Sequence, residues 1–252
     1  MADTDAETMS QEEKRVGRPT LETGLWILVG LVALSLRLAQ LDGAPLTAGE
    51  AEAALQAWRG ANGGALPVGD YNPFLLAANS LVFVLFGASD GLARLWPALF
   101  GTVLALTPAL LKRALGRAGA LTAGIYLALS PTALVASRQL DGTVIGAAGA
   151  MVCAGAAVRW GEPRRRGWLP WSAIGLALGL SGGASFYGVV LPLVVALIAV
   201  WRLRPEGGIG FLLQAVREAA VDGSRFVLVL LGALLAFSTG LGWNLTGLGA
   251  GG

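Results

Sequence analysis

The chain has 252 residues, of which 55% are apolar and 13% are charged, and its mean hydropathy is +0.66. This composition is typical of an integral membrane protein and excludes an ordinary soluble domain. The net charge of only +2 argues against a nucleic-acid partner, and the absence of histidine excludes histidine-based metal sites and Ser-His catalysis. The single cysteine, Cys153, lies in an apolar run and is interpreted as a packing residue.

Polar and apolar stretches divide the chain into a tail and a membrane domain. Residues 1–23 are polar and lack apolar periodicity, which predicts a disordered cytoplasmic tail. Residues 24–252 are predicted to form one all-α transmembrane bundle, because about 20 apolar residues cross a bilayer core. The seven predicted spans are Gly24–Leu41, Leu92–Leu111, Gly119–Ala136, Thr143–Val158, Leu169–Ser181, Ser185–Trp201 and Phe226–Gly242.

The basic residues decide whether the short apolar segment Pro73–Phe86 also crosses. If it does not cross, 14 of the 18 Lys and Arg lie on the cytoplasmic side, and only Arg37, Arg59, Arg94 and Arg138 remain at the outer face. We therefore predict a multi-pass protein of the cell membrane with a cytoplasmic amino terminus and an extracytoplasmic carboxyl terminus.

Three further segments are predicted to lie at a membrane surface rather than across it. The first outer loop, residues 42–91, contains Pro73–Phe86 as an interfacial helix and Ala48–Arg59 as a second short helix. Residues Gly210–Val221 have the spacing of an amphipathic helix on the cytoplasmic surface.

Glu50 is the first candidate for chemistry, and it has two interpretations. An acid at the outer end of a helix bundle is a functional candidate. Thr47-Ala48-Gly49-Glu50 also fits a capping box, in which the glutamate binds the amide of the capping threonine. Glu52 is expected to be solvated on another part of the same helix.

The second candidate is Asp141, which follows Arg138 in a short outer turn. Asp141 either contributes to a site with Glu50 or caps the next helix, and Arg138 either binds substrate or extends to the interface. Arg94 and Arg37 are further outer cations. Arginine binds phosphate through two hydrogen bonds, so these residues either hold a lipid phosphate or anchor the topology.

The order of several short motifs resembles the membrane domain of the C-type glycosyltransferase superfamily, in particular its dolichyl-phosphate-mannose-protein mannosyltransferase-like branch. The resemblance covers mainly Gly24–Val158. Its motifs are Leu36-Arg37-Leu38, Ala48-Gly49-Glu50-Ala51, Tyr71-Asn72-Pro73-Phe74, Phe86-Gly87-Ala88-Ser89-Asp90, Ala93-Arg94-Leu95-Trp96-Pro97-Ala98-Leu99, Leu129-Ser130-Pro131 and Ser137-Arg138-Gln139-Leu140-Asp141.

The resemblance implies a hexosyltransferase that takes a sugar from a polyprenyl-phosphate donor on the extracytoplasmic side. It implies that Glu50 accepts the acceptor proton and that Arg138 or Arg94, with Arg37 nearby, holds the phosphate. Asp141 would position substrate or a divalent cation.

Two departures from the family keep other interpretations open. Gly49 stands where the family has an aspartate, and the family continues beyond the length of this chain, which is expected to be an amino-terminal fragment or a short form. Further membrane segments or another subunit are therefore expected partners. The alternatives are a non-catalytic membrane subunit that binds lipid or assists assembly, and a small-molecule transporter.

Overall fold

The computed structural model describes residues 21–64, 72–160, 166–183, 186–188, 191 and 223–238. Within these ranges the regular structure is entirely helical, so the predicted all-α class is confirmed for the described part of the chain. The helices in chain order are α2 (Leu21–Leu38), α3 (Ala48–Ala61), α4 (Pro73–Phe86), α5 (Asp90–Ala93), α6 (Leu95–Leu106), η1 (Thr107–Leu111), α7 (Lys112–Leu129), α8 (Pro131–Ala136), α9 (Thr143–Trp160), η2 (Arg166–Trp168), α10 (Leu169–Ser181) and a helix at Gly223–Ser238.

Three of the described helical stretches are long and apolar enough to cross a membrane, namely Leu21–Leu38, Leu95–Leu129 and Thr143–Trp160. Shorter apolar helices occupy Pro73–Phe86, Leu169–Ser181 and Gly223–Ser238. These features indicate membrane association. The finer prediction of seven crossings stays a prediction.

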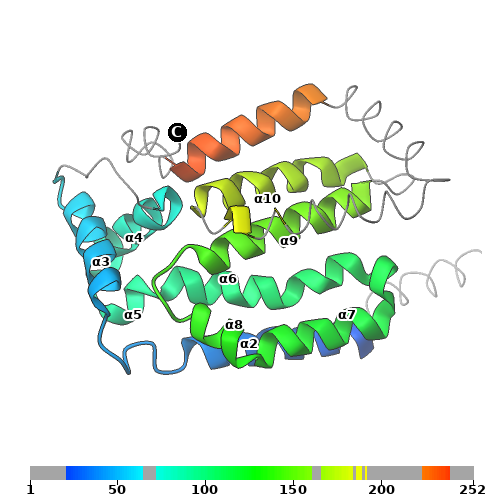
Figure 1. Ribbon diagram of the computed structural model, residues 1–252, viewed down its shortest axis with the longest axis horizontal. Helices are drawn as coiled ribbons and strands as arrows, with labels where there is room; N and C mark the ends of the chain where they lie inside the picture. Colours follow the sequence, from blue (N-terminus) through cyan, green and yellow to red (C-terminus); the bar gives the residue numbers. More distant parts are fainter. Residues whose placement is uncertain are drawn as a thin grey trace, which may run out of the picture.

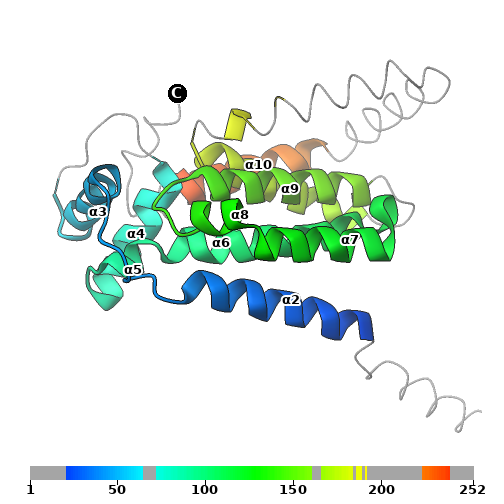
Figure 2. The same cartoon turned by 60° about the horizontal axis from the view of Figure 1, so that its bottom comes forward.

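The stretch Leu95–Leu129 folds back on itself at Gly116. Gly116 has φ 75° and ψ 165°, a left-handed conformation that interrupts the helix and that glycine adopts without steric cost. The two arms, α6 with η1 and the main part of α7, consequently lie side by side in opposite directions (Figures 1 and 2).

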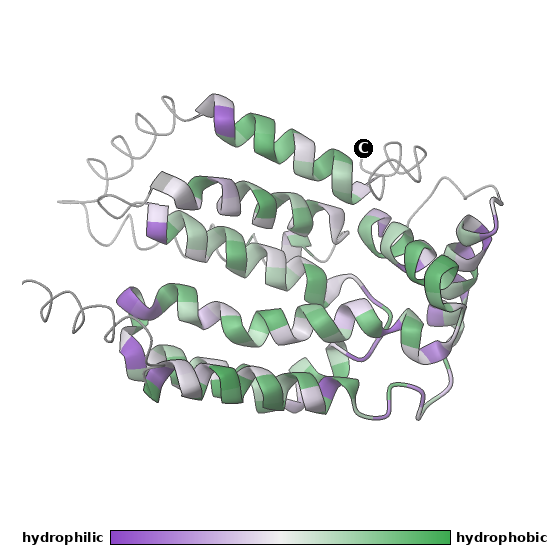
Figure 3. Cartoon of the chain, turned by 180° about the vertical axis from the view of Figure 1, so that it is seen from behind, coloured by the Kyte–Doolittle hydropathy of each residue, from purple (hydrophilic) through white to green (hydrophobic). Residues whose placement is uncertain are grey.

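The long helices form a bundle, and α3, α4 and α5 lie across one of its ends (Figure 1). We call this the loop end. Helix α2 packs on α6 and α7, and α9 packs closely on α10. Figure 3 shows hydrophobic residues along the helices of the bundle and hydrophilic residues gathered at its two ends.

The end of the bundle opposite α3 carries basic residues that bind neighbouring helices. Lys112 at the start of α7 pairs with Glu22 in α2 and lies over the ring of Trp26, 5.5 Å from its centroid. Arg159 in α9 donates hydrogen bonds to the carbonyl oxygens of Ala109 and Leu110 at 2.9 and 3.0 Å. The predicted basic segments around residues 112 and 159 are therefore at the same end of the molecule.

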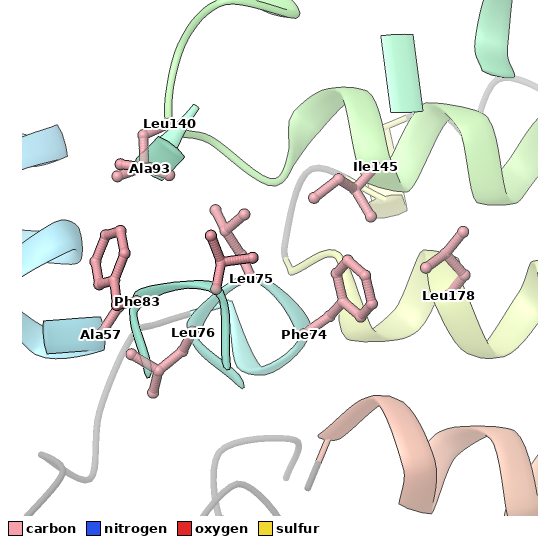
Figure 4. Close-up of a cluster of buried hydrophobic side chains, with 10 residues drawn as sticks. Ala57, Phe74, Leu75, Leu76, Phe83, Ala93, Leu140, Ile145 and Leu178 are labelled. Carbon is pink, nitrogen blue, oxygen red and sulfur yellow. The ribbon is translucent and has the colours of Figure 1, made fainter. Parts of the chain in front are cut away.

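A hydrophobic cluster attaches the loop end to the bundle. Its buried members come from α3, α4, α5, α9, α10 and the turn before α9 (Figure 4). The ring of Phe74 in α4 meets the rings of Trp96, Phe100 and Phe237 edge-on, with centroid distances of 5.9, 5.4 and 5.6 Å. Such aromatic contacts add to the effect of burial, so α4 is held firmly against α6 and the helix Gly223–Ser238.

Several predicted boundaries are corrected by the structure. Helix α2 begins at Leu21, three residues before the predicted span, and it ends at Leu38 because Gln40 takes a left-handed φ of 54°. The predicted span Leu92–Leu111 is interrupted at Arg94, which separates α5 from α6.

The predicted span Gly119–Ala136 is divided into α7 and α8, because Ser130, with ψ 122°, precedes a proline and leaves the helical conformation. By contrast, α4 and α10 have the predicted boundaries, and α3 extends the predicted Ala48–Arg59 by two residues. Residues 1–20 of the predicted tail, the span Ser185–Trp201 apart from a few of its residues, and Gly210–Val221 lie outside the described residues.

Candidate functional site

The turn before α3 forms the capping box that the sequence predicts. The Thr47 hydroxyl accepts a hydrogen bond from the Glu50 amide at 3.4 Å, and Glu50 Oε2 accepts one from the Thr47 amide at 2.9 Å. Oε2 also accepts from the Thr47 hydroxyl at 3.0 Å. The structural interpretation of Glu50 is therefore confirmed.

Glu50 also forms a buried ion pair with Arg94. Arg94 Nε donates to Oε1 at 3.1 Å and Arg94 Nη2 donates to Oε2 at 2.9 Å, which is a two-point guanidinium–carboxylate contact. The two residues are only 7% and 6% exposed. A further bond comes from the Leu140 amide, which donates to Oε1 at 2.8 Å. Glu50 thus joins the start of α3 to the start of α6 and to the turn before α9.

The other donors of Arg94 hold the loop between α2 and α3. Nη1 donates to the carbonyl oxygens of Leu41 and Ala44 at 3.1 and 2.7 Å, and Nη2 donates to that of Pro45 at 3.2 Å. With the two bonds to Glu50, all five N–H groups of the guanidinium are used. Arg94 is therefore a structural centre of the loop end, and its predicted contact with a substrate stays a prediction.

The surroundings of Glu50 determine its protonation state. Burial alone would raise the pKa of the carboxyl, but the hydrogen bonds from Arg94, from the Thr47 and Leu140 amides and from the Thr47 hydroxyl outweigh burial and lower the pKa to about 2. The same contact with Glu50 raises the pKa of Arg94 above its ordinary value. A general base works best when its pKa lies near the working pH. This geometry therefore favours the structural role of Glu50, and its predicted role as a base stays a prediction.

A polar pocket lies next to this ion pair, between α3, α4 and the turn before α9. Its volume is about 260 Å³, somewhat below the roughly 300–1,000 Å³ typical of pockets for drug-sized ligands. Its lining residues are Gly49, Glu52, Ala53, Gln56, Asn72, Leu75, Leu76, Asn79, Leu140, Asp141 and Gly142.

Asp141 is the one predicted site residue that lines this pocket. Its side chain is exposed and accepts a hydrogen bond from the Thr143 hydroxyl at the start of α9. Glu50 does not line the pocket, but it accepts a hydrogen bond from the amide of Leu140, the residue before Asp141. The two predicted carboxylates are therefore close in the structure, although only Asp141 lines the pocket. Glu52 is exposed and lines the pocket while Glu50 is buried away from it, so the expectation that Glu52 is solvated on another part of the helix is confirmed.

The remaining predicted residues lie away from the pocket lining. Arg37 is fully buried, and its guanidinium donates to the carbonyl oxygens of Ala33, Leu127 and Ala128 at 3.1, 2.9 and 3.3 Å, which binds α2 to the end of α7. Arg138 is half-buried in the turn after α8, and its side chain makes no hydrogen bond or ion pair with the residues that the structure describes. Substrate binding by either residue stays a prediction.

Three amide side chains in the pocket were not predicted as site residues, namely Gln56, Asn72 and Asn79. Asn72 caps α4, because its Oδ1 accepts from the Leu75 amide at 3.0 Å, and its Nδ2 donates to the Gly182 carbonyl at 2.8 Å. The sequence did contain a signal for Gln56. Gly49, Glu52 and Gln56 are spaced by three and four residues, which places them on one face of a helix.

A divalent cation was predicted as possible at Asp141, and it would need a group of side chains able to act as its ligands. Across the described ranges, no group of three His, Cys, Asp or Glu residues comes together in a way that could hold a metal ion. Glu52 and Asp141 supply only two carboxylates on the pocket wall. The described residues therefore do not form a conventional metal centre at Asp141.

Comparison with known proteins identified no match to this chain among protein-family models, curated proteins or solved structures.

Proposed function

We propose that this chain is a glycosyltransferase-like membrane domain in which the polar pocket receives a substrate of sugar transfer from a polyprenyl-phosphate donor. The observation that carries the proposal is the position of the pocket. Asp141 and Glu52 line a polar cavity at one end of an apolar bundle. Three of the seven motifs that resemble the glycosyltransferase superfamily contribute residues to its lining, namely those at 48–51, 71–74 and 137–141.

We further propose that the loop end faces the extracytoplasmic side and that the chain makes seven crossings of the cell membrane. The clustering of Lys112, Arg113 and Arg117 at the opposite end supports this orientation, since positive residues stay cytoplasmic. Trp58 and the end of α4, where Phe86 is 72% exposed, give the loop end an apolar edge that suits a membrane interface.

In this proposal Asp141 is the carboxylate that meets the acceptor, because it lines the pocket and Glu50 does not. The acceptor hydroxyl oxygen bonds to the anomeric carbon of the sugar while the bond from that carbon to the phosphate oxygen breaks. Asp141 takes the hydroxyl proton, and the polyprenyl phosphate leaves with the electron pair. Arg138, three residues away along the turn, is the cation proposed to stabilise the leaving phosphate.

The test is sugar transfer from a panel of polyprenyl-phosphate sugars, measured in membranes containing the full chain. Asp141→Asn keeps the size of the side chain and removes the base, so transfer is expected to fall by about two orders of magnitude or more. Asp90→Asn is the matched control, since Asp90 is an exposed carboxylate at the loop end that lies outside the polar pocket. Transfer at the wild-type rate by Asp141→Asn would remove Asp141 from the mechanism.

A non-catalytic membrane subunit is the second candidate, and two observations favour it. The Glu50 carboxylate is already occupied by Arg94 and by backbone amides, and Gly49 contributes no side chain to the pocket. In this case the chain would bind its ligand without transferring sugar, and no donor in the panel would give a product.

A further inference from the structure

The face of α3 that lines the pocket carries two polar side chains without partners in the described structure. Glu52 and Gln56 lie one turn apart on the same face. Neither side chain forms a hydrogen bond or an ion pair with a described residue. A carboxylate only accepts hydrogen bonds, so Glu52 brings negative charge and acceptor oxygens to the pocket.

Asn79 supplies an independent and more deeply buried acceptor. It lines the pocket from α4, is only 2% exposed, and donates through Nδ2 to the Ala93 carbonyl at 3.1 Å. Its Oδ1 is buried and has no partner among the described residues. A buried acceptor left unpaired is unfavourable, so a group that donates a hydrogen bond to it would be stabilised there.

The polar groups of the pocket are therefore mostly acceptors. The amide of Asn72 is occupied by the Leu75 amide and the Gly182 carbonyl. The Asp141 carboxylate accepts one hydrogen bond, from Thr143, and keeps further acceptor capacity. Among the described lining side chains, Gln56 has two donor hydrogens that no described residue uses and Asn72 and Asn79 have one each, and none of these residues is a lysine or an arginine.

We propose that this pocket binds a hydroxyl-rich group that also carries an ammonium, and that it excludes phosphate. The hydroxyls donate to Asn79 Oδ1 and Gln56, and the ammonium lies between the carboxylates of Glu52 and Asp141. A phosphate would bring negative charge and more acceptors to the same place, which is unfavourable on both counts. The volume of about 260 Å³ limits the bound group to roughly one sugar ring.

This inference rests on the proposed function only where it treats the bound group as a substrate, because binding is measured without turnover. The experiment uses the full chain in lipid nanodiscs and three probes, which are glucosamine, glucose and inorganic phosphate. Saturation-transfer NMR and ligand-dependent thermal unfolding report binding. Glucosamine is expected to bind on the order of tenfold more tightly than glucose, because its ammonium adds one charge-assisted hydrogen bond. Phosphate is expected not to bind.

Variants separate the charge from the hydroxyl contacts. Glu52→Gln with Asp141→Asn should remove the preference for glucosamine over glucose, whereas Asn79→Leu should weaken both sugars by a similar factor. Asp90→Asn should change neither. Glucosamine binding that stays unsaturated up to about 10 mM, a phosphate that binds as well as glucosamine, or a preference unchanged in the double variant would overturn the proposal. Saturable Mg²⁺ or Mn²⁺ binding without any sugar preference would also overturn it.

If sugar transfer fails and glucosamine binds as expected, the pocket chemistry is right and the proposed reaction is wrong. If transfer occurs but the binding preference is absent, the proposed reaction is right and the proposed pocket chemistry is wrong.

Discussion

Replacing Glu50 by glutamine tests whether this residue is the structural link of the loop end. Oε1 receives hydrogen bonds from Arg94 Nε and the Leu140 amide, and Oε2 receives them from Arg94 Nη2 and from Thr47. The amide NH₂ of a glutamine at position 50 would face donors on whichever side it occupied. Arg94, which is 6% exposed, would also keep its charge without a counter-ion.

The expected loss of stability follows from the pKa of Glu50. Folding lowers that pKa from 4.5 to about 2, and each pKa unit corresponds to about 1.4 kcal/mol, so the ionised carboxylate contributes roughly 3 kcal/mol. Removing one partner of a buried ion pair typically costs about 3–5 kcal/mol, which agrees with this value. We therefore expect Glu50→Gln to lower the free energy of unfolding by about 3 kcal/mol at pH 7.

The contribution also has a characteristic pH dependence. Because the pKa of Glu50 is lowered on folding, its contribution is fully present above the unfolded value of 4.5 and is lost as the pH falls toward 2. The difference in stability between wild type and Glu50→Gln should accordingly shrink across this range. Other carboxylates titrate there too, and comparing the two proteins at each pH removes most of their effect.

Unfolding in mixed micelles with increasing dodecyl sulfate, followed by tryptophan fluorescence from the chain's eight tryptophans, provides the assay. Glu52→Gln is the matched control on the same helix, and it should change stability by no more than about 0.5 kcal/mol, because the Glu52 carboxylate bonds no described residue. A Glu50→Gln protein as stable as wild type at pH 7, or a difference that does not change with pH, would refute the reasoning.

Arg94→Lys separates the structural role of Glu50 from a catalytic one. It keeps the positive charge and the Glu50 carboxylate but loses the two-point contact and the bonds to the loop carbonyls. If Glu50 acts only through structure, both variants should lower sugar transfer to a similar extent. If Glu50 is a base, only Glu50→Gln should lower it by about two orders of magnitude or more.

Three further predictions concern the pocket and the topology. Gly142→Val should destabilise the fold and close the pocket, because a Cβ at this position would collide with the Asn72 amide, and thermal unfolding of the purified variant checks this. Gly49→Asp should leave stability within about 0.5 kcal/mol, since nothing lies within 4 Å of a Cβ there, and should bind glucosamine more tightly by adding a third carboxylate; weaker binding would contradict the charge argument. In a background without the native cysteine, Ala88→Cys should react with an impermeant maleimide in intact cells and Ala114→Cys should not, and the reverse pattern would invert the proposed orientation.

The helices were predicted well where a local signal marks their ends. Asn72 followed by Pro73 gives α4 both its cap and its first residue, and the predicted limits Pro73–Phe86 are those observed. Boundaries were missed where one residue breaks a continuous apolar run. Arg94, which separates α5 from α6, and Ser130, whose conformation is set by the proline after it, each divide a stretch that was predicted as a single span.

The site was harder to predict because its partners are distant along the chain. The capping box needs only residues 47 and 50, and it was predicted. The bonds of Glu50 to Arg94 and Leu140 span 44 and 90 residues, and no local pattern encodes them. Arg94 and Arg37 were predicted either to hold a phosphate or to anchor the topology. The backbone carbonyls that bind them become neighbours only in the folded chain and could not be predicted from local sequence.

The bond from the Leu140 amide to Glu50 couples ligand occupancy to the stability of the loop end. One wall of the pocket is α3, whose first turn contains Glu50, and another is the turn that presents Asp141 beside Leu140. A ligand that contacts both walls requires a fixed distance between them, and the bond from Leu140 to Glu50 sets that distance. Coupling between two such events is reciprocal. A bound ligand should therefore slow hydrogen exchange at the Leu140 amide, and loss of the Glu50 carboxylate should weaken ligand binding, although Glu50 does not line the pocket.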